Sequence, residues 1–399
     1  MTLISHLTKT VVKNPYFTTY FIIASIALVV LASFLVSYIK STKSQIALLT
    51  TQKQSAENAL EVVQKELKFL KTQDQFVYNK NLQEEIDNIQ KTYKKGVDSY
   101  EKLLSLKEID KKTEKFDNLF TDAIVLLSQR NYASSEALLE SLNNQIRQQQ
   151  EKLVSQFVIP QNVPTKNLPP ASGYSRQQVK ADIGTFLVDI ITADLNSTRV
   201  IVDTASDSDC RDNCPVLSLS EYASRSNAYG GVNGSYFCPA SYPTCAGKAN
   251  SFDILLMNKN KVYFNSDNNK YSTIPLIYFS GNSAGIRGQS LEWGRDTGVN
   301  AVIANQGLLL SKGNIIFGGD GDPKKGSKGG RSFVGNKGSS AYIGVVHNAT
   351  VAEAAHALKA LGLENALNLD DGGSTALWYN GYKVGPGRNI PNAVLFIRK

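Results

Sequence analysis

Three absences narrow what this 399-residue chain can be. It has no arginine-rich tract and no zinc-finger spacing, so its formal charge of +8 does not indicate nucleic-acid binding. Residues 14–39 carry no charged side chain at all. Residues 41–155 contain no proline and only one glycine, Gly96, a composition typical of long helices. The first absence argues against nucleic acid as a partner. The other two divide the N-terminal part of the chain into an uncharged segment and a segment with a helical composition.

The uncharged run contains the segment Phe17–Ile39, which is long enough to cross about 30 Å of hydrocarbon as a helix. A cleaved signal peptide normally has an apolar region of about 7–15 residues and an A-x-A-like end, and neither feature fits this run. The sequence therefore predicts an uncleaved transmembrane anchor within residues 1–40. Lys9 and Lys13 favour a cytoplasmic N-terminus, although lysines on the other flank weaken that asymmetry. The rest of the chain is then expected outside the cytoplasm.

The cysteines bear on the same question. In an extracytoplasmic domain, an even number of clustered cysteines usually forms disulfides. Three pairings are open to four cysteines, and we prefer the local one, Cys210–Cys214 with Cys238–Cys245. Zinc is the alternative, but the spacings differ from the usual C-x2-C knuckles and no histidine lies near. No metal and no cofactor are predicted.

Residues 41–155 are expected to be α-helical. Apolar residues recur at steps of three and four, as in the series Leu60, Val63, Leu67 and Leu70. The pattern weakens at residues 72–81 and 110–113, which favours several helices over one unbroken coiled coil. Two interpretations stay open: a stalk or helical hairpin that spaces the next domain from the membrane, or a bundle that binds a protein partner or a second copy of the chain.

Residues 156–175 are punctuated by four prolines and predict an extended linker. After it, residues 176–399 alternate short β-type runs with turn residues. One helix is well marked, because Thr350-x-x-Glu353 is a capping box and Gly362 follows the apolar face. The predicted fold class is therefore α+β: a mixed, mainly antiparallel sheet with packed helices, preceded by a transmembrane helix and a helical stalk.

Four motifs in this last region resemble, in order, those of the phosphodiester glycosidase family. They are NGSYF at 233–237, RSFVG at 331–335, NLDDGGST at 368–375 and GRNIPNAV at 387–394. The resemblance covers residues 176–399 and does not extend before the linker. It implies a hydrolase that cleaves the bond between a sugar's anomeric carbon and a phosphodiester oxygen. The chain departs from the family at Asp371, where the family has glycine, and at two residue pairs in the first two motifs.

The resemblance implies a site in the acidic-glycine loop with Asp370 as a catalytic residue, and we expect its neighbour Asp371, an extra charge at the site, to be the second. Asp370 is expected to act as a base or to stabilise an oxocarbenium-like centre. Asp371 is expected to raise the pKa of Asp370, because neighbouring carboxylates resist ionising together. Arg331 and Arg388 are the expected phosphate clamps, since a guanidinium binds oxyanions with two parallel donors. The remaining expected substrate-binding residues are Asn233, Gly234, Gly372, Gly373, Ser374, Thr375 and Asn389.

The function that follows is a membrane-anchored, extracytoplasmic hydrolase acting on a sugar-1-phosphodiester in an envelope or exopolysaccharide glycan. An alternative from another class is a glycan-binding module on an anchored stalk, in which the same loop holds a ligand without turning it over. A third is a helical scaffold that carries the β-rich domain as a passenger. The intact Asp370 and both arginines favour the enzyme.

Overall fold

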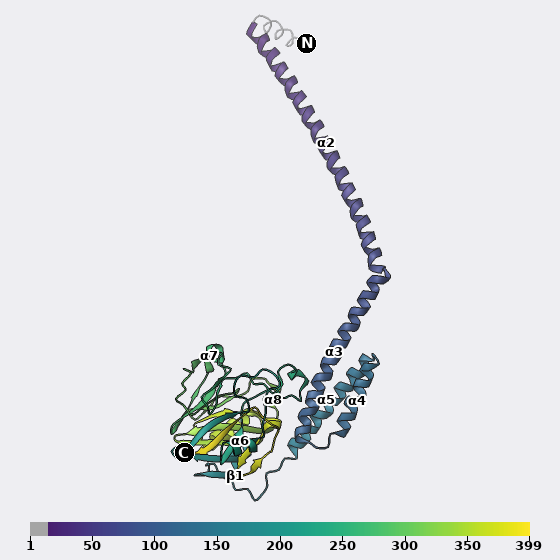
Figure 1. The fold of residues 1–399 in the computed structure, drawn as a ribbon. Coiled ribbons are helices and arrows are strands. Elements are labelled where there is room, and N and C mark those ends of the chain that lie inside the picture. The colour runs from purple at the N-terminus through teal and green to yellow at the C-terminus, as the bar shows by residue number, and fades with distance from the viewer. Residues whose placement is uncertain (1–14) are drawn as a thin grey trace. The chain divides into compact units, whose positions relative to one another are not determined.

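The computed structural model describes residues 15–399, with side chains described from Thr19 onward. Lys9 and Lys13, on which the orientation of the N-terminus was predicted, lie outside the described residues. The chain divides into two compact units, Met1–Asn88 and Ile89–Lys399, and each is described by itself. The described part of the first unit is helical, and the second holds helices and all the strands described (Figure 1).

The helix α2 (Pro15–Thr72) is continuous through the predicted anchor and far beyond it. It is the one helix among the described residues that is long and apolar enough to cross a membrane, and a signal sequence near an N-terminus would pass the same test. Gln73 interrupts the helical run, and α3 (Asp74–Ile109) begins after it. The interruption falls where the apolar pattern of the sequence weakens.

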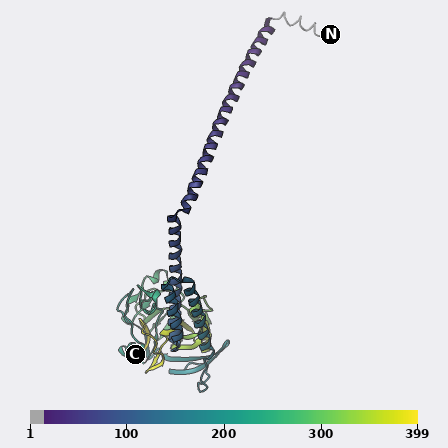
Figure 2. The ribbon, with the colours of Figure 1, turned by 90° about the vertical axis from the view of Figure 1, so that its right-hand side faces the viewer.

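Three helices share a small core of their own. The chain leaves α3 at Ile109, forms α4 (Glu114–Ser128), and returns in α5 (Tyr132–Ser155). The predicted weak point at residues 110–113 is the turn between the first two. The side chains that pack between these helices are Leu103, Leu106, Phe116, Leu142 and Ile146. The helices lie side by side in Figure 1 and again in the perpendicular view of Figure 2.

The largest sheet has seven strands and is covered on both faces. The helix α9 (Val351–Ala360) packs on one face, and it starts after the predicted capping box of Thr350 and Glu353. Burial on both faces explains why strands of this sheet are almost continuously apolar. The strands in spatial order are β1 (Gly173–Ala181), β2 (Gly184–Asp194), β13 (Ser340–Ala349), β12 (Gly329–Lys337), β14 (Asn365–Asn368), β10 (Leu308–Ser311) and β11 (Asn314–Ile315).

Two five-stranded sheets complete the domain. The first has the order β16 (Tyr382–Val384), β15 (Leu377–Tyr379), β4 (Gly230–Asn233), β17 (Asn392–Arg398) and β3 (Thr198–Thr204). The second has the order β6 (Tyr263–Phe264), β5 (Leu256–Met257), β9 (Ala301–Ala304), β7 (Leu276–Ser280) and β8 (Ser283–Arg287). The short helical pieces are α6 (Leu219–Arg225), η2 (Pro243–Cys245), α7 (Asn268–Tyr271), η3 (Ser290–Glu292), α8 (Pro323–Gly326) and η4 (Gly372–Ser374).

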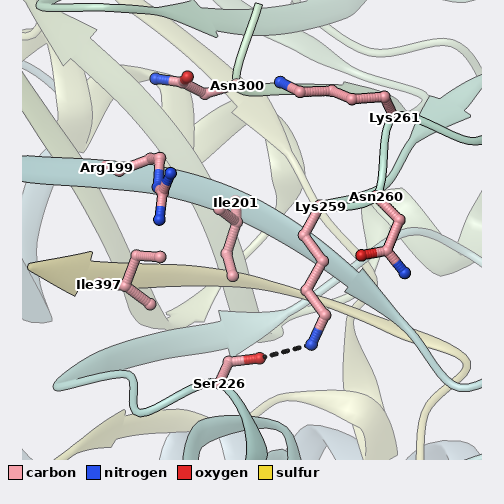
Figure 3. A pocket seen from close by; sticks show the side chains of 8 residues that line it. All are labelled: Arg199, Ile201, Ser226, Lys259, Asn260, Lys261, Asn300 and Ile397. Atoms are coloured by element: carbon pink, nitrogen blue, oxygen red, sulfur yellow. Dashed lines mark hydrogen bonds between the residues drawn. The ribbon is translucent and has the colours of Figure 1, made fainter. Parts of the chain in front are cut away.

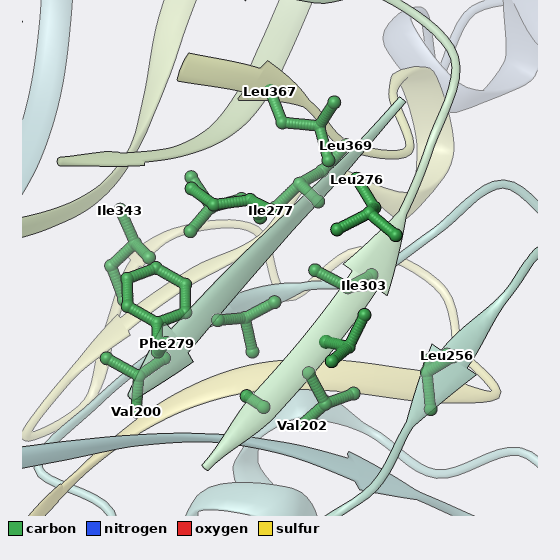
Figure 4. Close-up of a cluster of buried hydrophobic side chains, with 14 of the residues drawn as sticks. Val200, Val202, Leu256, Leu276, Ile277, Phe279, Ile303, Ile343, Leu367 and Leu369 are labelled. Atoms are coloured by element: carbon green, nitrogen blue, oxygen red, sulfur yellow. The ribbon is translucent and has the colours of Figure 1, made fainter. Parts of the chain in front are cut away.

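All three sheets contribute to one central core. Figure 4 shows its side chains converging from different strands, among them Val202, Ile303, Ile343 and Leu367. Leu369, also fully buried in this core, is the last apolar residue before the acidic loop. The core therefore fixes the chain up to the residue that precedes Asp370.

The α+β class is confirmed, and every strand pair among the described residues is antiparallel. A parallel bridge, Thr165 with Gln178, holds the proline-rich segment along β1. The predicted disulfide pairing is also confirmed, because Cys210 is bonded to Cys214 and Cys238 to Cys245.

Candidate active site

The acidic loop leaves the core at Asp370, whose backbone is held by the NGSYF motif. The amide N–H of Asp370 donates to the carbonyl of Gly234 across 2.8 Å. In return, the side-chain amide of Asn233 donates to the carbonyl of Asp370 across 2.6 Å. Asn233, 137 residues earlier in the chain, and its neighbour Gly234 therefore hold the backbone of Asp370 at both its C=O and its N–H.

Asn233 and Gly234 act within the protein rather than toward solvent. Asn233 is fully buried, and its side-chain oxygen accepts from the Ser332 hydroxyl at 2.7 Å and from the Ala376 N–H at 3.1 Å. A Cβ at Gly234 would lie 1.8 Å from the side-chain oxygen of Asn392, so glycine is the residue that fits there. The predicted substrate-binding pair is thus placed as a support beneath Asp370.

Asp371 is the most extensively bonded carboxylate of the loop. One oxygen accepts from the Arg331 guanidinium at 2.9 Å, from the Tyr236 hydroxyl at 3.1 Å and from the Asn368 side chain at 3.0 Å. The other accepts from the Ser332 N–H at 3.2 Å. Burial raises the pKa of Asp371, and Arg331 opposes that effect. The extra carboxylate is therefore anchored in the protein and is not a solvated charge.

Arg331 is also committed to the protein. Its Nε donates to the Ala349 carbonyl at 2.9 Å, and one terminal nitrogen donates to the carbonyls of Lys324 and Ser327. The other terminal nitrogen holds Asp371. With 5% of its side chain exposed, this predicted phosphate clamp joins the acidic loop to the glycine-rich segment before β12.

The side chain of Asp370 lies in a different environment. Burial raises its pKa to about 8; the hydrogen bond with Ser374 lowers it and the charge of Asp371 raises it further. The predicted influence of Asp371 is thus present, but burial is the larger cause. The charge of Lys324 also lowers the pKa of Asp370. A pKa raised to about 8 favours the protonated form of the Asp370 carboxyl at neutral pH.

Arg388 reaches the same loop from the GRNIPNAV motif. Its backbone N–H donates to the Gly373 carbonyl at 2.7 Å, and its guanidinium pairs with Glu108 of α3. The same carboxylate accepts from the Gly373 N–H at 2.7 Å. A Cβ at Gly373 would lie 2.4 Å from both Arg388 and Glu108, so a side chain here would displace them. Gly372 has a φ of +62°, a conformation that favours glycine.

The remaining predicted substrate-binding residues differ in how deeply they are buried. Ser374 is buried beside Asp370, and the Thr375 hydroxyl donates to the Gly330 carbonyl at 3.2 Å. Asn389 is exposed next to Arg388. Beneath the cations lies Tyr242, whose ring centroid is 5.5 Å from the Lys324 ammonium and 5.5 Å from the Arg388 guanidinium.

Residues of this arrangement that were not predicted include Glu108, Lys324, Tyr242 and Asn368, as well as Tyr236 and Ser332, which bond to Asp371. Asn368 stands inside the quoted NLDDGGST motif, so its role could have been suspected. Glu108 comes from an ordinary charged helical stretch far earlier in the chain, and nothing in its neighbours distinguishes it from a solvated residue.

Two pockets of the described residues lie away from this loop. Figure 3 shows a pocket of about 320 Å³ where Arg199, Lys259 and Lys261 gather, on the side of β3 and β17. Another, of about 510 Å³, lies between residues 317–327 and the start of α9. Neither is lined by Asp370 or Arg388. Among the described residues no group of histidine, cysteine, aspartate or glutamate is arranged to hold a metal ion.

The sequence of this region decides its class. Residues 226–397 match the model of a family described as phosphodiester glycosidase. This segment belongs to the phosphodiester glycosidase family. The predicted resemblance is thereby confirmed, and the match classes the domain with hydrolases that act on sugar phosphodiesters. All the predicted catalytic and substrate-binding residues lie within the matched segment, whereas Glu108 and the Cys210–Cys214 disulfide lie outside it.

Solved structures that match this chain have low sequence identity to it. A hypothetical protein from Synechocystis is 12% identical with a TM-score of 0.41, and the match covers 57% of this chain and 62% of that one. The chain thus spans less than two thirds of that protein. The zebrafish N-acetylglucosamine-1-phosphodiester alpha-N-acetylglucosaminidase catalytic domain, auto-inhibited by its pro-peptide, is 14% identical with a TM-score of 0.44, covering 60% of this chain and 87% of that one. No curated protein matches the chain.

Proposed function

We propose that this chain is a membrane-anchored, extracytoplasmic hydrolase that cleaves a sugar-1-phosphodiester. The observation that carries the proposal is that a carboxyl group with a raised pKa and a set of donors that can bind an anion lie at the same loop. Asp370 has a pKa raised to about 8, and Arg388 with the Gly373 N–H forms a set of anion donors beside it. A carboxyl group that stays protonated at neutral pH can approach an anionic diester without repelling it, and can give up a proton to it.

The reaction breaks the bond between the anomeric carbon and the phosphoryl oxygen, and the bonding electrons leave with the phosphate. The oxygen of water takes the place of that phosphoryl oxygen on the sugar. Asp370 donates its proton to the departing phosphate, and the proton released by water restores it. The products are a free sugar and a phosphomonoester. Phosphate is already a good leaving group, so Asp370 contributes mainly by stabilising the charge that develops along the breaking bond.

The other residues divide into two sets by what they contact. Arg388, Lys324 and the N–H groups at Gly372 and Gly373 would hold the diester's oxygens. Ser374, Thr375 and Asn389 would supply further donors to the sugar or the phosphate. Asp371, Arg331, Asn233 and Gly234 contact one another and the loop backbone instead. Their role in the proposed reaction is to hold Asp370 in position.

The location proposed for this reaction rests on two features. Both disulfides are of the kind that forms and persists outside the cytoplasm. The helix α2 has the length and composition of a transmembrane anchor. An envelope or exopolysaccharide glycan is then the accessible substrate. The helices α3 to α5 are the part of the chain through which a protein partner or a second copy would bind.

A glycan-binding module without turnover is the second candidate. The observation that favours it is that Arg331, one of the two predicted phosphate clamps, has its donors engaged by protein acceptors. In that case Arg388 would be the one arginine of the two predicted clamps that holds a glycan phosphate. The two candidates differ in whether the anomeric bond is broken, so a direct assay separates them.

The test is to incubate the purified full-length protein with a panel of sugar-1-phosphodiesters. Free sugar and phosphomonoester should appear in equal amounts, and Asp370→Asn should abolish most of the product. Binding of these compounds with no product from any of them would support the binding module and contradict the hydrolase.

A further inference from the structure

A carboxylate from the helix α3 is bonded to the hydrogen-bond donors of the candidate site that would bind an anion. Glu108 lies in the last turn of α3, and its carboxylate pairs with the Arg388 guanidinium. It also accepts from the Gly373 N–H at 2.7 Å and from the Tyr242 hydroxyl at 3.3 Å. Both charged side chains are about one fifth exposed, with 22% of each accessible to solvent. The contact is therefore neither a surface ion pair nor part of a core.

The donors that Glu108 uses are those a phosphate oxygen would use. Guanidinium groups and backbone N–H groups of glycine turns bind oxyanions of either kind, carboxylate or phosphate. The positive φ of Gly372 sets up the turn in which the Gly373 N–H reaches the carboxylate, and the absence of a Cβ on Gly373 leaves room for it. A phosphodiester cannot use this N–H and Arg388 while the carboxylate remains there.

The interactions within α3 do not favour an acidic side chain at the position of Glu108. The C-terminal end of a helix carries a partial negative charge, which disfavours an acidic side chain in the last turn. The compensating groups lie in the glycosidase domain instead. The position of Glu108 is thus explained by what it contacts across the interface.

The other contacts that α3 makes with the glycosidase domain are polar, and they are made with one loop that a disulfide closes. The Ser105 hydroxyl lies 3.1 Å from the Tyr242 hydroxyl, and Glu101 accepts from the Thr244 N–H at 2.9 Å. Both partners belong to the loop between Cys238 and Cys245. The apolar residues of the same turns, Leu103 and Leu106 among them, pack against α4 and α5 and not against this loop. Polar contacts of this kind contribute little net free energy, because water replaces them when they separate.

We propose that Glu108 is an internal occupant of the substrate's anion subsite, and that the end of α3 gates the site by placing or withdrawing it. The proposal rests on the proposed function for the nature of the competing ligand, a phosphodiester group. The subsite consists of the Arg388 guanidinium and the Gly373 N–H. Opening requires the loss of the polar contacts to Tyr242 and Thr244, and of the 3.4 Å hydrogen bond from the Asn348 side chain to the Val154 carbonyl of α5. The core between α3, α4 and α5 stays intact.

The experiment measures binding of dimethyl phosphate, a diester without a sugar, to the full-length protein by calorimetry. Glu108→Gln removes the competing charge and keeps the size of the side chain. We expect this variant to bind dimethyl phosphate about tenfold more tightly than the unaltered protein, the size of an ordinary coupling between two sites. Glu101→Gln, which weakens the docking of α3 on Thr244, should shift the affinity in the same direction by a smaller factor.

The matched control is Glu84→Gln, the same change on the same helix at an exposed residue that pairs with Lys80. It should bind dimethyl phosphate as the unaltered protein does. Adding Arg388→Ala to Glu108→Gln should remove the gain, because the subsite then lacks its cation. Melting curves establish that each variant is folded, and Glu108→Ala is measured beside Glu108→Gln as a second variant of the same residue.

Two results would overturn the proposal. Equal affinity in the unaltered protein and in both Glu108 variants would show that the carboxylate does not compete. Weaker binding in both would show that Glu108 helps to build the ligand site. Because binding is measured without turnover, the gate and the hydrolase can fail separately. Tighter binding of dimethyl phosphate by Glu108→Gln, together with no product from any sugar-1-phosphodiester, would support the gate and contradict the proposed reaction.

Discussion

The guanidinium of Arg331 lies 2.9 Å from the carboxylate of Asp371, and both side chains are more than nine-tenths buried. Arg331 comes from β12 and Asp371 from the acidic loop, so this ion pair ties the loop to the seven-stranded sheet. Such a pair is costly to break from one side, because the remaining charge is left buried without a partner. If Asp371 were replaced by the family's glycine, the charge of Arg331 would be buried without its carboxylate partner.

A double-mutant cycle tests this tie. Arg331→Met and Asp371→Asn should each lower the free energy of unfolding by about 3–5 kcal/mol, and the double variant should lose less than the sum. The exposed pair of Asp267 and Lys270 serves as the control, since its side chains are 74% and 70% accessible. Strictly additive losses in the buried pair, measured by urea unfolding, would show that the two charges do not stabilise each other.

Asp370→Asn separates chemistry from folding. The amide has nearly the shape of the carboxyl group, and the backbone bonds from Asn233 and to Gly234 do not involve the side chain. We expect kcat/KM for a sugar-1-phosphodiester to fall by a factor of about 10²–10⁴, as for the loss of one acid–base group. The melting temperature at pH 5 should be unchanged. Full activity in this variant would mean that the loop is only a turn.

The raised pKa of Asp370 also predicts a pH dependence of stability. Its pKa is about 8 in the folded protein against 3.8 for an ordinary aspartate, so folding retains a proton that the unfolded chain has released. The stabilisation from this group is complete below pH 3.8 and is lost as the pH rises through about 8. Compared with Asp370→Asn, the unaltered protein should therefore lose stability between pH 5 and pH 9. Melting curves of the two proteins that stay parallel over this range would contradict the raised pKa.

The two disulfides should differ in their effect on the site. Replacing Cys238 and Cys245 by alanine frees the loop on which α3 rests, and should cost about 2–3 kcal/mol of stability from loop entropy alone. It should also strengthen binding of dimethyl phosphate, because the docking surface of α3 is loosened. Replacing Cys210 and Cys214 should cost a similar amount without that gain, since that loop is hydrogen bonded to Ala249 instead. Calorimetry on both double variants measures the difference.

The position of the chain in the cell can be tested by proteolysis. If α2 is an uncleaved anchor with its N-terminus inside, protease added to intact cells should digest the glycosidase domain. Permeabilised cells provide the control for access. N-terminal sequencing of the intact protein checks the anchor, because a chain that starts after Ile39 would show a cleaved signal.

Local patterns allowed the helices to be predicted well. Thr350 and Glu353 mark the start of α9 because a capping box is made by residues three apart. The same holds for the turn near residues 110–113, where the apolar repeat stops. The two disulfides were also within reach, since each closes a short loop.

Contacts between distant residues could not be predicted in this way. Arg331 carried the right charge for a phosphate clamp, but the pair it forms with Asp371 joins residues 40 apart, and only the pairing of β12 with β14 brings them together. Glu108 is further removed still, at 265 residues from Gly373. A periodicity reports which side of a helix is buried, and it carries no information on which loop of another domain meets the end of that helix.

The place of β17 in its sheet has a consequence for how the protein folds. This strand lies between β3 and β4, and it pairs Val394 with Val202 and Val232. Until residues 392–398 arrive, β3 and β4 each lack their shared neighbour and present open backbone edges. Closing such a long loop is slow, because chain entropy is lost before the pairing repays it. Folding of this domain is therefore expected to be slow, with an interval in which unpaired edges can join those of another chain.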